Sequence, residues 1–192
     1  MTDLYDKIDF HSYIDSSLAE KKLKIKLITE DFMKKRVDDF MKFINGIRNE
    51  YKNEYNWKEE NKEYFLSGLN DKWKYSFTIV DENENLCFVN FSSVYDDIIH
   101  NHCTYAKKEC RSMGLAKYHM IKLCQTGIDN GFNYQEGYWP KSNNSSIILF
   151  LKMGWEVQSI RNNHDLFMIA NLVKVRNQTY ELIKKENKKI II

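Results

Sequence analysis

The chain has 192 residues, of which 43% are hydrophobic and 29% are charged, and its 29 basic residues nearly balance 27 acidic ones. A chain of this length can bury one hydrophobic core, so we expect a single domain over residues 1–192. The formal charge of +2 lacks the basic excess of nucleic-acid-binding proteins, and we expect no nucleic-acid partner.

The cysteines and the distribution of apolar residues indicate the cellular compartment. The four cysteines are Cys87, Cys103, Cys110 and Cys124. They form no CxxC pair and have no histidine at metal-ligand spacing, which predicts reduced thiols and no metal site. No stretch approaches the ~18 apolar residues that span a bilayer, and residues 1–10 lack the apolar run of a signal peptide. We therefore expect a cytoplasmic protein that is not associated with a membrane.

Hydrophobic periodicity predicts alternating helices and strands in the first half of the chain. Residues 10–20 have helical spacing, and residues 23–27 alternate as a strand does. Thr29 is suited to cap an amphipathic helix that reaches Ile47, and the aromatic-rich stretch up to Phe65 predicts a second helix. Two alternating stretches, 73–79 and 86–91, flank a polar turn as in a β-hairpin, and a further strand is expected at 98–106.

The second half continues the same mixture. Gly114 opens a long helix that ends at Asn130 and Gly131, and a strand is expected at 132–138. A short helix at 145–152, a hairpin of 155–160 with 166–171, and a final helix follow. This order predicts an α/β, or three-layer α+β, domain around one sheet, with helical extensions over 1–22 and 172–192. The extensions would either pack on the core or form a homodimer contact.

The most informative segment joins the strand at 98–106 to the long helix through the sequence RSMGLA at 111–116. A glycine in such a turn lets backbone amides approach a pyrophosphate without a Cβ in the way, and the helix N-terminus favours an anion. Arg111 and Lys117 add positive charge beside it. The segment therefore predicts an anion-binding cradle, although the pattern RxxGxA alone also fits an ordinary strand-to-helix turn.

Two motifs resemble those of the GCN5-related N-acetyltransferases (GNAT). The residues at 111–116 resemble the family's coenzyme A motif, R/Q-x-x-G-x-G/A. Residues 143–155 resemble its second signature, N-x-x-A-x-x-x-Y-x-x-x-G-F, with Ser146, Phe150 and Trp155 in place of Ala, Tyr and Phe. The motifs occur in the family's order and at its separation. The resemblance implies a GNAT-type mixed, mostly antiparallel central sheet flanked by helices.

The resemblance also implies acetyl-coenzyme A as the acyl donor and no metal. Backbone amides of residues 112–117 would hold the pyrophosphate, and backbone groups of 104–106 would pair with the pantetheine arm as an added strand does. The side chain of Asn143 would also contact the cofactor. The cofactor-binding residues implied in this way are Thr104, Tyr105, Ala106, Arg111, Ser112, Met113, Gly114, Leu115, Ala116, Lys117, Asn143 and Phe150.

His100 and His102 are the candidate catalytic residues. An amine that attacks a thioester needs a base to remove its proton, and histidine suits this role best near neutral pH. The two histidines alternate within a strand and therefore point to the same face. Their pattern is similar to that of the arylalkylamine N-acetyltransferases, in which paired histidines deprotonate the amine. The alternative is that the two histidines are structural residues held by hydrogen bonds.

Cys103 and Cys110 have no activating histidine on the same face and are not expected to be nucleophiles.

Phe150 departs from the family pattern at a position where a tyrosine commonly protonates the leaving thiolate. Phenylalanine keeps the ring but has no proton to give. Tyr105, Tyr134 and Tyr138 lie on the two strands beside the expected cofactor cleft and could supply the missing hydroxyl.

These observations together predict an acetyl-CoA-dependent N-acetyltransferase. Its acceptor would be a primary amine of a small molecule, which attacks directly in a ternary complex. The aromatic residues from Tyr51 to Phe65 would line the acceptor side, although aromatic residues at helical spacing also fit a hydrophobic core. Two alternatives stay open: acetylation of a protein or peptide amine, and a GNAT-fold module that binds acyl-CoA without catalysis.

Overall fold

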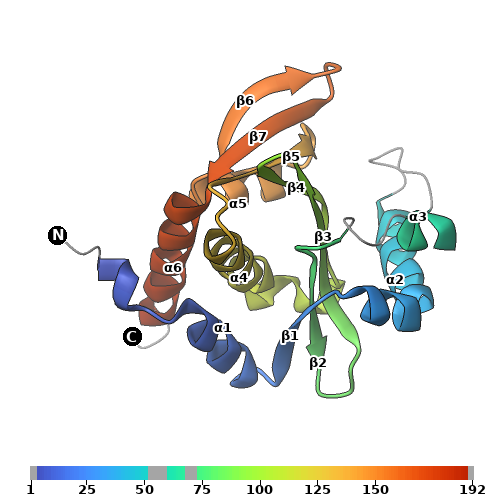
Figure 1. The fold of residues 1–192 in the computed structure, drawn as a ribbon, viewed down its shortest axis with the longest axis horizontal. Helices are drawn as coiled ribbons and strands as arrows, with labels where there is room; N and C mark the ends of the chain where they lie inside the picture. Colours follow the sequence, from blue (N-terminus) through green and yellow to red (C-terminus); the bar gives the residue numbers. More distant parts are fainter. Residues whose placement is uncertain (1–3, 52–59, 68–72, 190–192) are drawn as a thin grey trace.

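The computed structural model in Figure 1 describes residues 4–51, 60–67 and 73–189. In this part of the chain seven strands form one sheet in the order β1-β2-β3-β4-β5-β7-β6. Neighbouring strands are antiparallel except for β4 and β5, which are parallel. The predicted mixed, mostly antiparallel sheet is therefore confirmed.

The bounds of the elements agree closely with the predicted ones at most positions. The strands are β1 (Leu23–Leu27), β2 (Phe77–Asp81), β3 (Leu86–Tyr95), β4 (Ile98–Ala106), β5 (Tyr134–Pro140), β6 (Glu156–Arg161) and β7 (Asp165–Asn171). The helices are α1 (Phe10–Ala19), α2 (Glu30–Glu50), α3 (Lys62–Leu66), α4 (Leu115–Asp129), α5 (Asn144–Lys152) and α6 (Leu172–Lys189), with 3-10 helices η1 (Leu4–Lys7) and η2 (Lys108–Met113).

The strand predicted at 73–79 shows the largest difference at its start. Residues 73–75 form a turn, and β2 starts only at Phe77. Trp73 has a φ of 70° and is buried, with its ring centroid 4.6 Å from that of Phe91 and its Nε1 donating to the carbonyl of Phe65 at 2.9 Å. Trp73 is thus buried against α3, whereas Tyr75 is buried in a different cluster, 5.2 Å from the ring centroid of Phe132. The alternation of these aromatic residues therefore reflects burial and not an extended backbone.

Helices cover both faces of the sheet (Figure 1). On one face, Val80 and Val89 pack with the apolar side chains of α2 and α3. On the other face, Ile79 and Phe88 pack with α1 and α4. The two terminal helices α1 and α6 both pack against α4. The predicted extensions therefore contact the core in this structure.

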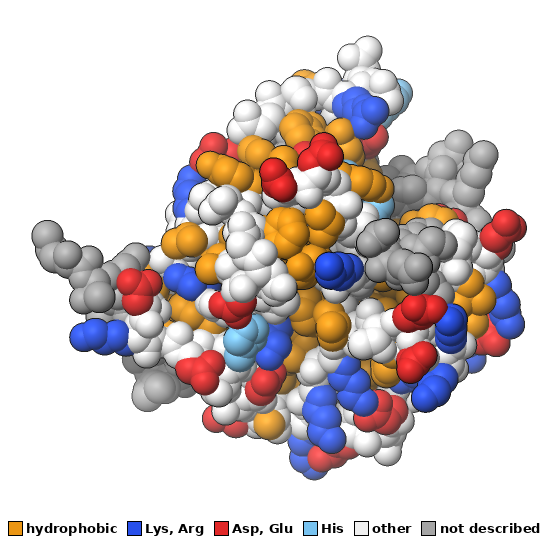
Figure 2. Space-filling view, viewed as in Figure 1, with side chains coloured by type: hydrophobic (Ala, Val, Ile, Leu, Met, Phe, Trp, Pro, Cys, Tyr) orange, Lys and Arg blue, Asp and Glu red, His pale blue; other side chains and the backbone are white. Residues whose placement is uncertain are grey.

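The surface agrees with the balanced composition. Acidic and basic side chains are interspersed over the face that Figure 2 shows. None of the helices in the described ranges is both long enough and apolar enough to cross a bilayer.

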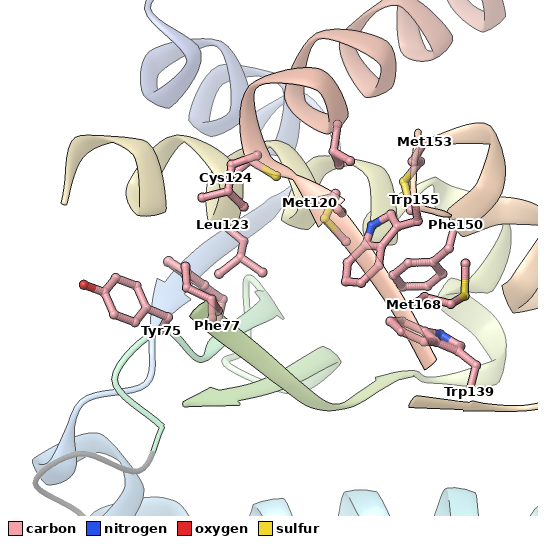
Figure 3. Close-up of a cluster of buried hydrophobic side chains, with 14 of the residues drawn as sticks. Tyr75, Phe77, Met120, Leu123, Cys124, Trp139, Phe150, Met153, Trp155 and Met168 are labelled. Carbon is pink, nitrogen blue, oxygen red and sulfur yellow. The ribbon is translucent and has the colours of Figure 1, made fainter. Parts of the chain in front are cut away.

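A cluster of aromatic and sulfur-containing side chains joins α4, α5 and the end of β5 (Figure 3). The ring centroid of Trp139 lies 4.7 Å from that of Phe150 and 4.8 Å from that of Trp155. Met168 and Met120 belong to the same buried cluster. Such close ring packing fixes the position of α5 against the sheet, because rings at these distances gain contact energy beyond their buried area.

His119 makes the stability of this fold sensitive to acid. The side chain is fully buried in α4 between Phe77 and Phe88, and neither ring nitrogen has a hydrogen-bond partner among the described residues. Burial lowers the pKa of His119 from 6.5 to about 3. Below pH 6.5 the unfolded chain therefore binds a proton that the folded chain cannot bind, and the free energy of unfolding falls as the pH falls toward 3.

We expect His119→Leu to remove this pH dependence. The wild type should lose about 2 kcal/mol more of its unfolding free energy than the variant between about pH 7.5 and about pH 5. Urea unfolding of both proteins at the two pH values measures the difference. Parallel losses in the two proteins would show that His119 is not the group responsible.

Candidate active site

The site lies where β4 and β5 separate. Their parallel ladder runs from the pair Ile98–Tyr134 to the pair Asn101–Gly137, where it ends. A Cβ on Gly137 would lie 3.0 Å from the carbonyl oxygen of Asn101 and 2.9 Å from the ring of Trp139, so only glycine allows this close approach. Beyond the ladder the sheet edge of β4 faces an opening, with backbone groups directed into it.

A cavity of about 720 Å³ fills this opening. The predicted cofactor-binding residues that line it are Thr104, Tyr105, Ala106, Arg111, Ser112, Gly114, Leu115, Ala116, Lys117, Asn143 and Phe150. Met113 lies in η2 and packs against the core instead. His102 also lines the cavity. Residues from both predicted motifs and one candidate base thus surround the same space.

The N-terminus of α4 forms one end of the cavity. Gly114 has a φ of 75° and is the N-cap of this helix, and no side chain of the described residues caps the first turn. The first backbone amides of a helix have no partner within the helix, and its dipole favours an anion at this end. The chain reaches Gly114 from β4 through the 3-10 helix η2.

The two predicted basic side chains of the cradle are already paired with carboxylates. Arg111 donates from Nη2 to Glu50 Oε2 and from Nη1 to the Tyr51 hydroxyl, each at 2.8 Å. Lys117 forms an ion pair with Glu186 of α6. The favourable potential for an anion at this end therefore comes mainly from the helix amides. Arg111 in addition ties the C-terminal end of α2 to the cradle.

The two candidate bases share one face of β4, as their alternation predicts. Their ring centroids are 4.9 Å apart at an interplanar angle of 70°. The register with β3 steps from Phe91–Cys103 to Ser92–Asn101, which makes His102 the extra residue of a β-bulge. The bulge lies next to the point where β4 and β5 separate, and His102 lines the cavity there while His100 does not.

Each histidine has a polar partner that the sequence did not reveal. His102 Nε2 forms a hydrogen bond with the Ser93 hydroxyl on β3. His100 Nδ1 lies 2.9 Å from Glu136 Oε1 on β5. Both partners come from neighbouring strands, so only the register of the sheet could have identified them.

The side of the cavity toward α2 and α3 contains a partly buried ion pair and phenol groups. Arg48 Nη1 lies 2.7 Å from Glu60 Oε1, and its Nε donates to the Tyr105 hydroxyl at 3.3 Å. Burial raises the pKa of Tyr105 to about 12 and also raises that of Tyr64, so both phenols are protonated at neutral pH. Tyr51 and Tyr64 line the cavity.

The other candidate residues on this side lie partly in the cavity lining and partly outside it. Phe65 is buried in the core rather than lining the cavity, and residues 52–59 of the predicted aromatic wall lie outside the described residues. Of the three candidate acids, Tyr105 and Tyr138 line the cavity, whereas Tyr134 lies outside its lining and is 46% exposed.

Burial raises the pKa of the Cys103 thiol to about 12, which disfavours a nucleophilic thiolate. The described residues contain no group of three side chains suited to hold a metal ion.

Comparison with known proteins shows what this arrangement resembles. No protein-family model matches the chain, and neither does any curated protein sequence. Solved structures do match. The PaiA N-acetyltransferase of Thermoplasma acidophilum in complex with coenzyme A has a TM-score of 0.65 at 13% identity, over 78% of this chain and 98% of that one.

Two further structures agree with this result. A GNAT-family acetyltransferase from Staphylococcus aureus has a TM-score of 0.64 at 13% identity, over 78% of this chain and 99% of that one. The ribosomal-protein-S18-alanine N-acetyltransferase of Escherichia coli has a TM-score of 0.62 at 12% identity, over 78% of this chain and 94% of that one. At such low identity the likeness concerns the fold, and the chain has the fold of the GNAT acetyltransferases.

Proposed function

We propose that the protein is an acetyl-CoA-dependent N-acetyltransferase that acts on a primary amine of a small molecule. The observation that carries this proposal is that one cavity joins the N-terminus of α4 to His102 along the opened edge of β4. An anion site, a strand edge and a base are the three parts that a thioester with a pyrophosphate tail requires.

The residues present fit coenzyme A. The first amides of α4, with Gly114 leaving the approach open, would hold the pyrophosphate. Backbone groups of Thr104 to Ala106 would pair with the amides of the pantetheine arm. Asn143 lines the cavity while its Oδ1 caps α5 by accepting from the amide of Ser146 at 3.3 Å. The thioester would then lie toward His102.

His102 would act as the general base. An amine that attacks the thioester carbonyl forms a C–N bond and loses a proton to the imidazole, and the C–S bond breaks to release coenzyme A. Removing a general base typically costs 10²–10⁴-fold in rate. The chemistry needs no covalent acyl-enzyme, because the amine and the thioester can meet in one ternary complex.

Tyr138 is the group best suited to protonate the departing thiolate. Phe150 is buried and has no hydroxyl, and the Tyr105 hydroxyl is occupied by Arg48 and has a raised pKa of about 12, which makes it a weaker acid. We expect Tyr138→Phe to lower turnover by about 10- to 100-fold, and Tyr105→Phe to have a smaller effect. Steady-state rates at neutral pH, with the KM for acetyl-CoA as the control for binding, measure both. Equal losses in the two variants would remove Tyr138 from this role.

Thermal unfolding with acetyl-CoA tests the proposed function before any acceptor is known. A ligand at about 100 times its Kd should raise the melting temperature of a chain of this size by about 5–10 °C. Adenosine 3′,5′-bisphosphate, which lacks the pyrophosphate and the pantetheine arm, serves as the control and should raise it less. An unchanged melting temperature with saturating acetyl-CoA would contradict the proposal.

A further inference from the structure

We propose that Glu136 is a positioning residue for the pair His100 and His102. Its carboxylate holds His100 in the Nδ1–H tautomer and places one negative charge behind His102. The effect on rate rests on the proposed function. The effect on the tautomer does not, because it concerns the protein alone.

The geometry favours a single arrangement of this hydrogen bond. His100 and Glu136 are register partners on the parallel strands β4 and β5, so their side chains leave the sheet on the same face. His100 Nδ1 lies 2.9 Å from Glu136 Oε1, and the two side chains are only 13% and 20% exposed. An ionised carboxylate can only accept a hydrogen bond. The proton of a neutral His100 must therefore be on Nδ1, which leaves the lone pair on Nε2.

The same carboxylate affects the charge of the whole group. When His102 accepts a proton from the amine it becomes a cation, at a ring distance of 4.9 Å from His100. With a neutral His100 and an ionised Glu136, the summed charge of His100, His102 and Glu136 changes from one negative charge to zero in this step. Without the carboxylate, it would change from zero to one positive charge in a half-buried position, which is less favourable. Glu136 therefore makes His102 a more effective base.

The other polar groups around the pair do not replace this charge. Tyr95 and Tyr138 contact His100 through their rings, at centroid distances of 5.2 and 5.8 Å. The guanidinium of Arg161 lies over the ring of Tyr138, 4.9 Å from its centroid. Arg48 on α2 is compensated by Glu60. Among residues 4–51, 60–67 and 73–189, the carboxylate that forms a hydrogen bond with His100 is that of Glu136.

Glu156 provides a matched control in the same sheet. Glu136 on β5 and Glu156 on β6 are both register partners of Ile169, one on each side of β7. Glu156 forms an ion pair with Lys174 and not with a histidine. Glu156→Gln therefore removes a carboxylate from the same row of the sheet without touching the pair.

Heteronuclear NMR of histidine-labelled protein tests the tautomer directly and needs no substrate. We expect His100 to be in the Nδ1–H tautomer in the wild type and in Glu156→Gln. In Glu136→Ala we expect a shift to the Nε2–H tautomer or to a mixture of the two. The Nε2–H tautomer in the wild type, or an unchanged tautomer in Glu136→Ala, would overturn the inference.

The rate is tested with whichever acceptor the wild type acetylates. Glu136→Gln should lower kcat by about 10-fold or more, leave the KM for acetyl-CoA unchanged, and shift the half-maximal point of the acid limb of the pH–rate profile to lower pH. A merely structural role would lower the rate without moving that limb, and this result would overturn the inference.

If His102→Gln loses activity while Glu136→Gln does not, the inference fails and the proposed function stands. If the wild type binds acetyl-CoA but transfers to no acceptor, the proposed function fails and the NMR result alone decides the role of Glu136.

Discussion

Gly114→Trp should weaken the binding of acetyl-CoA by at least about 100-fold, which removes about 2.7 kcal/mol or more of binding free energy. Gly114 stands at the N-terminus of α4 with a φ of 75°, at the end of the cavity where the pyrophosphate would lie. Even a Cβ there would come within 3.4 Å of the side chain of Lys117, and an indole would extend well beyond it. Isothermal titration calorimetry measures the effect.

Gly131→Trp is the control for the strain that such a substitution causes. Gly131 follows the opposite end of α4 with a φ of 85°, and a Cβ at this position would have no described atom beyond its chain neighbours within 4 Å. Both variants therefore place a side chain in the left-handed region, which costs about 1–2 kcal/mol of stability. We expect only Gly114→Trp to lose acetyl-CoA binding. Equal affinities for the two folded variants would show that the N-terminus of α4 does not hold the cofactor.

His102→Gln should lower turnover by about 100-fold or more at neutral pH while acetyl-CoA still binds. Glutamine keeps a polar side chain that can hydrogen-bond with Ser93 but cannot accept a proton at this pH. His100→Gln should have a smaller effect, because His100 lies behind His102 and does not line the cavity. The double variant should be no more active than His102→Gln, since the two side chains act as one unit.

His164→Gln supplies the control for histidine loss. His164 is exposed in the turn between β6 and β7, away from the cavity lining. Its substitution should leave both turnover and the KM for acetyl-CoA within about twofold of the wild type. If His102→Gln turns over as fast as His164→Gln, His102 is not the general base and has a structural role.

The features that the sequence predicted well depend on residues that are close together in the chain. The cap at Thr29 is one example, since its side chain accepts from the amide of Phe32 at 3.2 Å as expected. The shared face of His100 and His102 is another, because alternation within one strand is a local property. Gly114 likewise marks the strand-to-helix turn by its own conformational freedom.

The features that the sequence did not predict depend on how distant segments come together. Glu136 contacts His100 only because β4 and β5 pair in one particular register. Ser93 reaches His102 across a β-bulge that leaves no signal in the sequence. The pairing of Arg111 with Glu50 joins residues of η2 and α2, and periodicity within either segment contains no information about it.

The most direct test is the release of free coenzyme A from acetyl-CoA in the presence of a panel of amines. The panel should include arylalkylamines, polyamines, aminoglycosides and peptides, with wild type and His102→Gln measured side by side. We expect amine-dependent thiol release by the wild type with at least one small primary amine, and a loss of about 100-fold in the variant. Release with peptides alone would assign a protein acceptor instead. Binding of acetyl-CoA without amine-dependent release from any member of the panel would contradict the proposed catalysis.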